Sequence, residues 1–591
     1  MDSERHGGTA VAEVLQRHGV RFLFTLCGGH ISPILIACKQ AGIRVVDVRH
    51  EATAVFAADA VSRLSGVPGV AAVTAGPGLT NTVTAVKNAQ LAQSPLIVLG
   101  GATATVLKGR GSLQDIDQFA LMRPHVKWLA RVRRVRDIAP AVERAFAEAQ
   151  SGVPGPVFVE LPIDLLYPQR LVAQFYDLKP SGEVRGLGAK LLNAYLSWHV
   201  RRLFAGAGAG LPPARPVSVP EPGAGALRRA GRLLERSQRP LLLVGSQAVV
   251  RAGEVEAVRA AVERLGVPVY LSGMARGLLG RQHPLLLRHR RKQALKAADA
   301  VLLAGVPNDF RLNYGREVGA KTPLISINLS RADLLKNRRP TLAILGDPGR
   351  GLRALAAGAA GEAGAAAWAA GAGRFRREAW IAERQANDAE REAEIAAQAE
   401  PGADGINPLR LLRRLDDTLA EDSVLVGDGG DFVATASYTV KPRGPLRWLD
   451  PGVFGTLGAG AGFALGAKLA RPGAEVWILY GDGSVGYSLS EWDTFVRHGV
   501  PVIGVVGNDA GSSQIAREQV ALFHDPVGTE LRHTDYHRVA EGFGGAGLKL
   551  DQDEQTGPVL RQAKALAAQG TPVLVNAICR RTDFRKGSVS M

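Results

Sequence analysis

Short runs of apolar residues alternate with longer segments of helical periodicity along most of the chain. In the first part, from about residue 8 to 170, these runs are Phe22–Leu26, Arg44–Val48, Val70–Thr74, Leu96–Leu99 and Val157–Glu160. Strands of this kind alternating with helices predict a parallel sheet wrapped by helices. The pattern recurs from residue 239 to about 346 and from about 407 to 582. We therefore expect an α/β protein with three doubly wound parallel-sheet domains.

Two stretches of unusual composition separate these parts. Residues 205–225 are rich in glycine, proline and alanine, and residues 352–373 are rich in alanine and glycine. A charged segment from Arg374 to Ala399 follows and predicts a helix on the outside of the protein. The expected limits are an N-terminal domain at 1–175, a linker with an amphipathic helix at 176–232, a central domain at 233–350, a linker and helix at 351–404, and a C-terminal domain at 405–591.

The segment Leu187–Phe204 combines apolar residues near helical spacing with aromatic and basic side chains. The residues concerned are Leu192, Leu196, Val200, Leu203, Trp198, Arg201 and Arg202. Two interpretations stay open. The segment is a helix packed on its own domain, or it is a basic amphipathic helix that touches a membrane surface or guides a fatty chain.

Length and composition restrict the class of protein. A chain of 591 residues is too long to fold around one hydrophobic core. Its composition, with 46% hydrophobic and 21% charged residues, is that of a globular protein. The net charge of +17 fits either a generally basic surface or attraction of polyanions such as diphosphate, coenzyme A or an acidic membrane. We find no zinc-ligand spacing and no aromatic RNA-binding motif, and expect no nucleic acid partner. Three cysteines suit a reducing compartment, and no apolar run is long enough to span a bilayer.

The most specific chemical pattern lies in the third part of the chain. Gly481-Asp482-Gly483-Ser484 follows one apolar run, and Asn508 follows the next, 508 − 482 = 26 residues after Asp482. At the ends of neighbouring parallel strands, the Asp482 carboxylate and the Asn508 amide would come together, with the Ala510 carbonyl as a third oxygen. Such ligands suit Mg²⁺, and the glycines let backbone amides approach a diphosphate closely. The pattern predicts a magnesium and diphosphate site.

Further candidate residues follow other predicted strands. Glu51 begins a helix after the second strand, and the loop after the third strand has glycines and a proline where backbone passes close to a ligand. The loop residues are Gly76, Pro77, Gly78 and Asn81. Gln114 lies in the segment 111–117, and the third part adds Gly430, Phe432 and Leu457. None of these short patterns identifies a ligand by itself.

Together the motifs resemble those of the thiamine-diphosphate enzymes, a family that includes acetolactate synthases, oxalyl-CoA decarboxylase and the 2-hydroxyacyl-CoA lyases. The family pairs its GDG motif with two asparagines, and here Gly507 replaces the first of them. The resemblance implies that Glu51 hydrogen-bonds the aminopyrimidine ring of thiamine diphosphate, that Asp482 and Asn508 hold Mg²⁺, and that Leu457 props the cofactor into its bent shape. It also implies a homodimer or homotetramer, because the family's site lies between subunits.

Four further runs resemble the animal 2-hydroxyacyl-CoA lyases in particular: residues 24–33, 272–280, 445–451 and 493–498. This resemblance implies cleavage of a long-chain 2-hydroxyacyl-CoA to formyl-CoA and a fatty aldehyde one carbon shorter, as in fatty acid α-oxidation. Gln114 would orient the substrate hydroxyl, and either His30 or the iminopyrimidine of the cofactor would remove its proton. Arg276 is the candidate contact to the coenzyme A phosphates.

Two alternatives remain. One is an acetolactate synthase that condenses pyruvate and binds FAD in the central domain. The other is a catalytically silent, membrane-associated binding partner, against which the intact Glu51, Asp482 and Asn508 argue. The resemblance implies location at the endoplasmic reticulum membrane, with the family's anchor segment outside this chain; the alternative is a soluble cytoplasmic protein.

Overall fold

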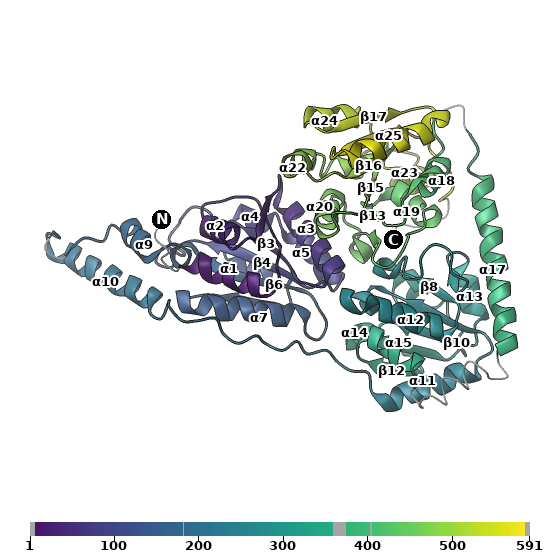
Figure 1. Ribbon diagram of the computed structural model, residues 1–591, viewed down its shortest axis with the longest axis horizontal. Coiled ribbons are helices and arrows are strands. Elements are labelled where there is room, and N and C mark those ends of the chain that lie inside the picture. Colours follow the sequence, from purple (N-terminus) through teal and green to yellow (C-terminus); the bar gives the residue numbers. More distant parts are fainter. Residues whose placement is uncertain (1–5, 181–182, 359–373, 402–404, 586–591) are drawn as a thin grey trace. The chain divides into compact units, whose positions relative to one another are not determined.

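The computed structural model describes residues 6–180, 183–358, 374–401 and 405–585. Three sheets of six strands each form the framework, and helices flank each sheet (Figure 1). The prediction of three α/β domains with parallel sheets is confirmed. The chain divides into two compact units, residues 1–62 with 67–218 and residues 63–66 with 219–591.

Six parallel strands form the N-terminal sheet: β1 (Phe22–Thr25), β2 (Arg44–Asp47), β3 (Gly69–Val73), β4 (Leu96–Ala102), β5 (Trp128–Arg131) and β6 (Pro156–Pro162). Their order in space is β2-β1-β3-β4-β6-β5. The five strands expected from apolar runs are present, and β5 has no counterpart among them. It lies at the edge of the sheet, and all four of its residues are half-buried.

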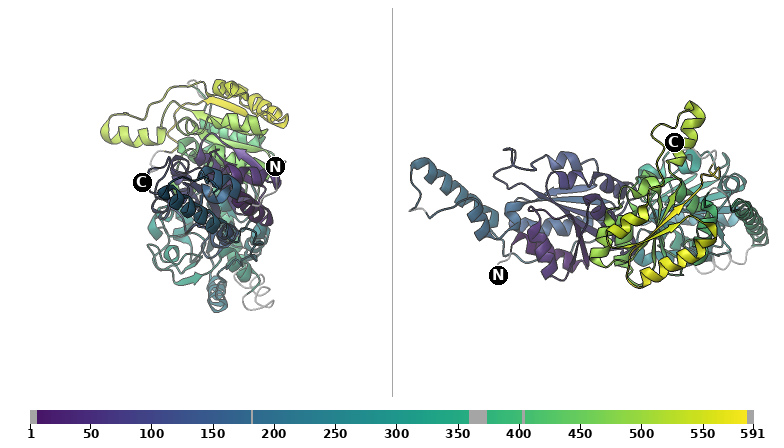
Figure 2. Two further views of the ribbon diagram at one scale, coloured as in Figure 1. Left: turned by 90° about the vertical axis from the view of Figure 1, so that its left-hand side faces the viewer. Right: turned by 90° about the horizontal axis from the view of Figure 1, so that it is seen from above.

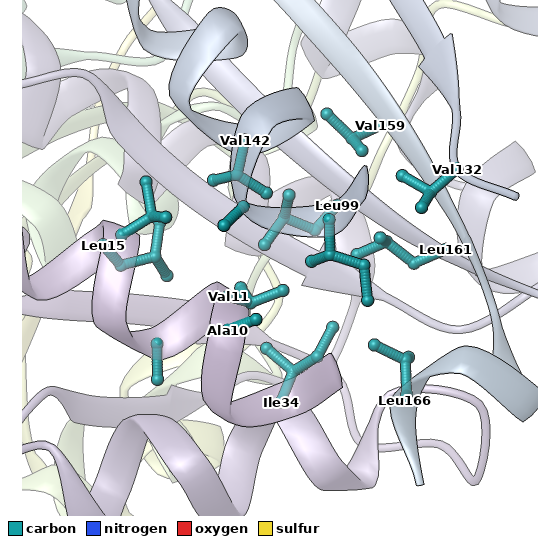
Figure 3. Close-up of a cluster of buried hydrophobic side chains, with 14 of the residues drawn as sticks. Ala10, Val11, Leu15, Ile34, Leu99, Val132, Val142, Val159, Leu161 and Leu166 are labelled. Atoms are coloured by element: carbon teal, nitrogen blue, oxygen red, sulfur yellow. The ribbon is translucent and has the colours of Figure 1, made fainter. Parts of the chain in front are cut away.

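The helices of this domain are α1 (Gly7–Arg17), α2 (Ser32–Gln40), α3 (Glu51–Ser65), α4 (Pro77–Thr80), α5 (Val83–Leu91), α6 (Gln118–Met122), α7 (Ile138–Gln150), α8 (Ile163–Leu166), α9 (Gln169–Phe175) and α10 (Leu187–Phe204). The His6 ring caps α1 by accepting a hydrogen bond from the Gly8 amide at 3.1 Å. Val11 and Leu15 of α1 are fully buried with Leu99 of the sheet (Figure 3). Burial of each such side chain stabilises the fold by roughly 1.5–3 kcal/mol.

The central sheet consists of β7 (Pro240–Val244), β8 (Val269–Leu271), β9 (Leu286–Leu287), β10 (Ala300–Ala304), β11 (Leu324–Asn328) and β12 (Leu342–Leu345). These strands are parallel, in the order β12-β11-β10-β7-β8-β9. The helices are α11 (Ala224–Arg236), α12 (Val255–Leu265), α13 (Arg291–Ala297), α14 (Arg331–Leu334) and α15 (Pro348–Ala356). Buried Leu227, Ala230 and Leu234 make α11 part of this domain, although it begins inside the expected linker.

The expected charged helix is α17 (Arg374–Ala397). It is fixed to the central domain because the indole of Trp380, which is 2% exposed, donates a hydrogen bond to the Pro240 carbonyl at 3.0 Å. Most of the alanine- and glycine-rich stretch before it, residues 359–373, lies outside the described residues. The first residues of that stretch end α15.

The C-terminal sheet consists of β13 (Val424–Gly427), β14 (Trp448–Leu449), β15 (Val476–Gly481), β16 (Ile503–Asn508), β17 (Ala546–Leu550) and β18 (Val573–Ile578). The strands are parallel, in the order β14-β13-β15-β16-β18-β17. The helices are α18 (Pro408–Thr418), α19 (Gly430–Thr439), α20 (Gly460–Ala470), α21 (Asp482–Val485), α22 (Glu491–His498), α23 (Ser513–Phe523), α24 (Tyr536–Gly542) and α25 (Thr556–Ala568). In the parts of the chain that the structure describes, no helix combines the length and the apolar character needed to cross a bilayer.

Candidate cofactor site

Strands β15 and β16 carry the most specific candidate residues at their carboxyl ends. The two strands are adjacent and parallel, so Asp482 and Asn508 lie at the same edge of the sheet. Asp482 is 3% exposed, and its carboxylate accepts hydrogen bonds from the Gly483 amide at 2.8 Å and the Gly511 amide at 2.9 Å. Burial, and then the Asp509 carboxylate, raises the pKa of Asp482 to about 6. The predicted pairing of strand ends is therefore present, with a carboxylate held in a fixed orientation.

The Asn508 side chain has a buried oxygen at this edge that is not used in hydrogen bonds among the described residues. It is completely buried, and its Nδ2 donates to the Thr534 carbonyl at 3.2 Å and to Asn576 Oδ1 at 3.1 Å. Its Oδ1 is buried and has no hydrogen-bond partner among the described residues. Buried acceptors are rarely left in that condition, and a bound cation with oxygen ligands would satisfy this one.

The Ala510 carbonyl is in a different situation. Its oxygen accepts hydrogen bonds from the Leu531 amide and from Arg581 Nη2, both at 2.9 Å. A cation at this oxygen would have to compete with the Arg581 guanidinium. Within the described ranges, no group of three His, Cys, Asp or Glu side chains could hold a metal ion. The expected site is of another kind, with one carboxylate and one amide oxygen.

Glycines near these strand ends are not explained by packing of the chain on itself. A Cβ atom at Gly481 or Gly483 would meet no other atom of the chain closer than 3.8 Å. Gly430 has space for a Cβ atom, although its φ of +84° favours glycine. The nearby Ser484 hydroxyl donates to the Gly481 carbonyl at 3.0 Å. The backbone at 481 and 483 therefore has room for a ligand to approach it closely, as the diphosphate interpretation requires.

The replacement of the family's first asparagine by Gly507 has a physical reason. A Cβ atom at position 507 would lie 2.2 Å from Cδ2 of Phe432. Phe432 is 7% exposed and belongs to the core cluster of this domain. The phenyl ring therefore fills the space of the missing side chain. Gly430 and Phe432 are the two candidate diphosphate contacts on α19. Because the Phe432 ring packs against β16, we expect the contact from the Gly430 backbone.

We expect Gly507→Asn to lower the stability of the C-terminal domain by about 1–3 kcal/mol, because the added side chain overpacks against the Phe432 ring. Thermal unfolding measures the loss. The same substitution made in a Phe432→Ala background should cost less, because the obstructing ring is then absent. Equal costs in the two backgrounds would contradict the contact.

Leu457 lies against the glycine turn that follows β13. A Cβ atom at Gly429 would be 2.6 Å from Leu457 Cδ2. Leu457 itself is half-buried, so it is not a core leucine and is available to support a ligand. The neighbouring Asp431 carboxylate is paired with Arg517 Nη2 at 2.9 Å, which leaves its backbone as the group that could meet a diphosphate.

Asp428 ties this turn to the segment that carries Leu457, and the sequence analysis did not find it. Its Oδ1 accepts a hydrogen bond from the Ala459 amide at 2.8 Å, whereas its buried Oδ2 has no partner among the described residues. A Cβ atom at Gly460 would lie 2.9 Å from that oxygen and 2.8 Å from the Tyr480 ring, so only glycine fits there. Burial raises the pKa of Asp428 to about 8. The carboxyl therefore holds a proton around neutral pH.

This raised pKa predicts a pH dependence of stability. Between the unfolded pKa near 4 and the folded pKa of about 8, the folded chain binds the proton and the unfolded chain does not. Stability from this group is therefore lost as pH rises, by at most about 1.4 kcal/mol per pH unit. We expect the melting temperature of Asp428→Asn to fall less than that of the parent chain between pH 5 and pH 8. Parallel curves would contradict a protonated Asp428.

In the N-terminal domain, Glu51, Gly78 and Asn81 come together. Glu51 begins α3 and is 6% exposed, and its Oε2 accepts a hydrogen bond from Asn81 Nδ2 at 2.9 Å. Gly78 lies next to this carboxylate, since a Cβ atom there would be 3.6 Å from Oε1. Pro77 occupies the first turn of α4, where a proline fits, and this places the loop beside Glu51. The structure thus supports the grouping of the loop with the glutamate.

Gln114, in the segment 111–117, lies against Gly76 of the same loop, and Gln118, which the sequence analysis missed, also contacts Gly76. A Cβ atom at Gly76 would be 2.9 Å from Gln114 Cβ, and Gly76 has a φ of +63° that favours glycine. The buried Gln118 accepts a hydrogen bond from the Gly76 amide at 3.4 Å and donates to the Gly101 carbonyl at 3.1 Å. Its Nε2 also lies 3.4 Å from Oε2 of the fully buried Glu160. Gln118 therefore holds the glycine turn in place.

His30 is near the loop but does not contact Glu51 in any hydrogen bond that the structure shows. Its Nδ1 is 3.1 Å from the Thr74 hydroxyl, and a Cβ atom at Gly101 would lie 2.5 Å from His30 Cβ. Burial lowers the pKa of His30. The ring is therefore neutral at physiological pH and has a nitrogen able to accept a proton.

Arg276 lines a cavity of about 350 Å³ whose walls carry many positively charged side chains. The basic residues on its walls are Arg276, Arg281, Arg288, Arg290, Arg291, Lys292 and Lys441. Five of them lie within 4.0 Å of a carboxylate, which is Glu317 for Arg291 and Glu390, Glu392, Glu394 or Glu421 for the others. Arg276 Nη1 donates to the Ser437 carbonyl at 3.1 Å, and its guanidinium lies over the Trp448 ring. Its buried Nε has no hydrogen-bond partner among the described residues. The cavity suits a phosphorylated ligand.

Comparison with known proteins identifies the family of the chain. Family models of the N-terminal, central and C-terminal domains of thiamine pyrophosphate enzymes match residues 5–121, 227–355 and 428–577. A 2-hydroxyacyl-CoA lyase 2 from Bos taurus is 53% identical, over 100% of this chain and 92% of the relative. The chain belongs to the thiamine pyrophosphate enzyme family.

Other members of the family are similar to this chain to different degrees. A 2-hydroxyacyl-CoA lyase 2 from Homo sapiens is 52% identical, again over 100% of this chain and 92% of the relative. A probable acetolactate synthase from Mycobacterium bovis is 36% identical over 97% of this chain and 95% of the relative. The resemblance to the thiamine-diphosphate enzymes is confirmed, and the acetolactate synthases are more distant than the lyases.

Proposed function

We propose that this chain is a thiamine-diphosphate- and Mg²⁺-dependent lyase that cleaves a long-chain 2-hydroxyacyl-CoA to formyl-CoA and a fatty aldehyde one carbon shorter. The bond between C1 and C2 breaks, the hydroxyl on C2 loses its proton, and C1 gains one. The observation that carries the proposal is the similarity along the whole chain to proteins named 2-hydroxyacyl-CoA lyase 2. Glu51, Asp482 and Asn508 remain in place, which supports an active enzyme over a silent binding partner.

The chain offers residues that fit the cofactor. Thiamine diphosphate supplies an electron sink for carbon–carbon cleavage when it is bound. Asp482 and the unsatisfied Oδ1 of Asn508 would hold Mg²⁺, and the amides at Gly481 and Gly483 would approach the diphosphate. Glu51 would hydrogen-bond the aminopyrimidine ring, oriented by its contact with Asn81.

Two side chains fit roles at the substrate hydroxyl, one in orienting it and one in removing its proton. Gln114 cannot ionise, so its role would be to hydrogen-bond the hydroxyl or the thioester carbonyl and orient it. His30 is neutral at physiological pH and could accept the hydroxyl proton at its free ring nitrogen. The iminopyrimidine of the cofactor is the other candidate base.

We further propose that the cavity at Arg276 binds the phosphates of coenzyme A. Arg276 and Lys292 both line it, and neither has a carboxylate partner among the described residues. We expect Arg276→Gln to raise the KM for the CoA thioester about tenfold or more with a smaller effect on kcat, because a charge-assisted hydrogen bond is lost. Steady-state kinetics measure the split. Arg471→Gln is the matched control, since that guanidinium also donates to a backbone carbonyl but does not line the cavity.

The assembly and location follow from the same proposal. We propose at least a homodimer, and allow a homotetramer, because the family's site lies between subunits. Location at the endoplasmic reticulum membrane and a soluble cytoplasmic state both remain proposals. Sedimentation and fractionation of the tagged chain would distinguish them.

One incubation tests the function. The purified chain receives 2-hydroxyoctadecanoyl-CoA, thiamine diphosphate and Mg²⁺, and mass spectrometry follows heptadecanal and formyl-CoA. Formation of both, dependent on the cofactor, is the expected result. Acetolactate formed from pyruvate, together with a flavin absorption spectrum, would instead favour the synthase activity named for the relative at 36% identity. No turnover of either substrate would favour a silent binding partner.

A further inference from the structure

The carboxyl half of helix α10 is fixed to the N-terminal domain. Val200, Leu203 and Phe204 are buried and belong to the core cluster of that domain. The His199 ring lies 2.8 Å from the Thr105 hydroxyl, which adds a polar contact at the same end. The interpretation of a helix packed on its own domain is thus confirmed for this half. The prediction of a lipid-facing apolar surface that includes Val200 and Leu203 is wrong, because both side chains are buried inside the domain.

The amino half of α10 leaves a different set of apolar side chains exposed. It runs outward from the N-terminal domain, as two directions of view show (Figure 1 and Figure 2). The exposed fractions are 77% for Leu187, 64% for Leu191, 58% for Leu192, 51% for Tyr195 and 54% for Trp198. Residues 187, 191, 195 and 198 are three or four positions apart and therefore share one face of the helix. We call these five residues the α10 patch.

The α10 patch is not a loose end of the chain. The Asn193 side chain, in the middle of the helix, makes two hydrogen bonds to the backbone of Lys179. Its Oδ1 accepts from the amide at 3.1 Å and its Nδ2 donates to the carbonyl at 3.0 Å. These bonds tie the middle of α10 to the segment that precedes it.

Within the segment that contains the α10 patch, all charges have one sign; the carboxylates of Asp177 and Glu183 lie just before it, and Asp177 pairs with Lys179 at 3.4 Å. From residue 184 to residue 220 the sequence has no aspartate or glutamate, whereas it has Arg185, Lys190, Arg201, Arg202 and Arg215. The Arg202 guanidinium lies over the Trp198 ring, with 5.4 Å between Cζ and the ring centroid. Leucines, tyrosine and tryptophan next to lysine and arginine are the combination found in helices that lie at the surface of an anionic bilayer.

We propose that the α10 patch docks on an anionic lipid surface, with its leucine and aromatic side chains among the acyl chains and the basic residues at the headgroups. The lipid supplies the negative charge that this part of the chain lacks. The proposal is independent of the lyase activity, since it concerns where the protein binds and not what it cleaves. If the substrate is a long-chain acyl-CoA, the same contact brings the enzyme to the surface where such molecules partition.

A second copy of the chain is the other occupant to consider. In a two-fold contact centred on Tyr195, Lys190 of each copy would lie opposite residues near Arg201 of the other. No carboxylate between residues 184 and 220 could compensate these charges. Repulsion between like charges therefore disfavours pairing of this helix with itself and favours an anionic surface.

The test is flotation of the full chain with vesicles of phosphatidylcholine, with and without phosphatidylserine, at low and high salt. We expect binding that needs phosphatidylserine and weakens with salt. Leu191→Glu with Trp198→Glu should reduce the partition coefficient at least about tenfold, because apolar burial is lost and negative charge is added. The matched control is Ile36→Glu with Leu335→Glu, which makes the same change at side chains that are 56% and 41% exposed elsewhere.

Each outcome decides the proposal. Loss of binding in the α10 variant, with the control variant bound and both melting like the parent chain, supports it. Turnover of a short-chain 2-hydroxyacyl-CoA in solution should stay the same in the α10 variant, so failure here is distinguishable from failure of the lyase proposal. Equal vesicle binding by all three proteins would overturn it. So would absence of vesicle binding with a smaller oligomer in the α10 variant, which would make the patch an interface between copies.

Discussion

Replacing Glu51 by glutamine is expected to lower kcat for 2-hydroxyacyl-CoA cleavage by about 10²–10⁴-fold while thiamine diphosphate still binds. Glutamine has the size of glutamate and its oxygen can still accept the hydrogen bond from Asn81 Nδ2. It cannot carry the negative charge needed to stabilise the protonated aminopyrimidine ring at a position that is 6% exposed. Release of formyl-CoA gives the rate, and titration calorimetry gives the affinity for the cofactor.

Glu148→Gln provides the control for this substitution. Glu148 is in the same domain and loses the same charge, but it pairs with Arg144 one helical turn away on α7. Its kcat should equal that of the parent chain. Full lyase activity in Glu51→Gln would refute the assignment of Glu51 to the cofactor, and with it the use of the Asn81 contact as a positioning device.

Asp482→Asn is expected to weaken Mg²⁺ binding by about 100-fold or more, since removing a charged ligand costs at least as much as disturbing its supporting hydrogen bonds. Activity should fall with it and should recover only in part at high Mg²⁺ concentration. The raised pKa, about 6, adds a second expectation for the parent chain. Its Mg²⁺ affinity should fall as pH drops below about 6, because the protonated carboxyl no longer ligates the ion.

Titration with Mg²⁺ from pH 5 to pH 8 measures both effects. Asp493→Asn is the matched control: this carboxylate pairs with Arg497 on α22, 2.7 Å from Nε, and is not at the strand end. Its affinity should equal that of the parent chain at each pH. If Asp482→Asn bound Mg²⁺ as tightly as the control, the cation would have to lie elsewhere and Asn508 Oδ1 would remain unexplained.

The domain architecture was predictable because its signal is local. Strands buried on both faces must be apolar along their whole length, as β3 and β4 are, and all five runs expected in the first part are strands in the structure. The edge strand β5 was not among the expected strands; its residues are half-buried, and the other edge strand, β2, has only one fully buried residue. The helix α11 begins within the expected linker and buries its apolar stripe of Leu227, Ala230 and Leu234.

The residues of the candidate site also fall into two groups, those that motifs identified and those that only the structure revealed. Glu51, Asp482 and Asn508 stand in short motifs whose order along the chain was enough to find them. Asp428 and Gln118 stand in no such motif. Asp428 meets Ala459 and Gln118 meets Gly76 across separations of 31 and 42 residues, and only the folded chain brings these groups together.

The sequence by itself thus determined three parallel α/β domains, the strand ends that carry Asp482 and Asn508, and the family to which these motifs belong. The tertiary structure decided which polar atoms remain available to bind a ligand. Among the described residues, it leaves Asn508 Oδ1 without a hydrogen-bond partner, pairs the Ala510 carbonyl with Arg581, and places the Phe432 ring against Gly507, where the resemblance implied an asparagine. It also divides α10 into a buried half and an exposed half. Motifs report residue order, whereas burial and hydrogen-bond saturation depend on neighbours that are distant in sequence.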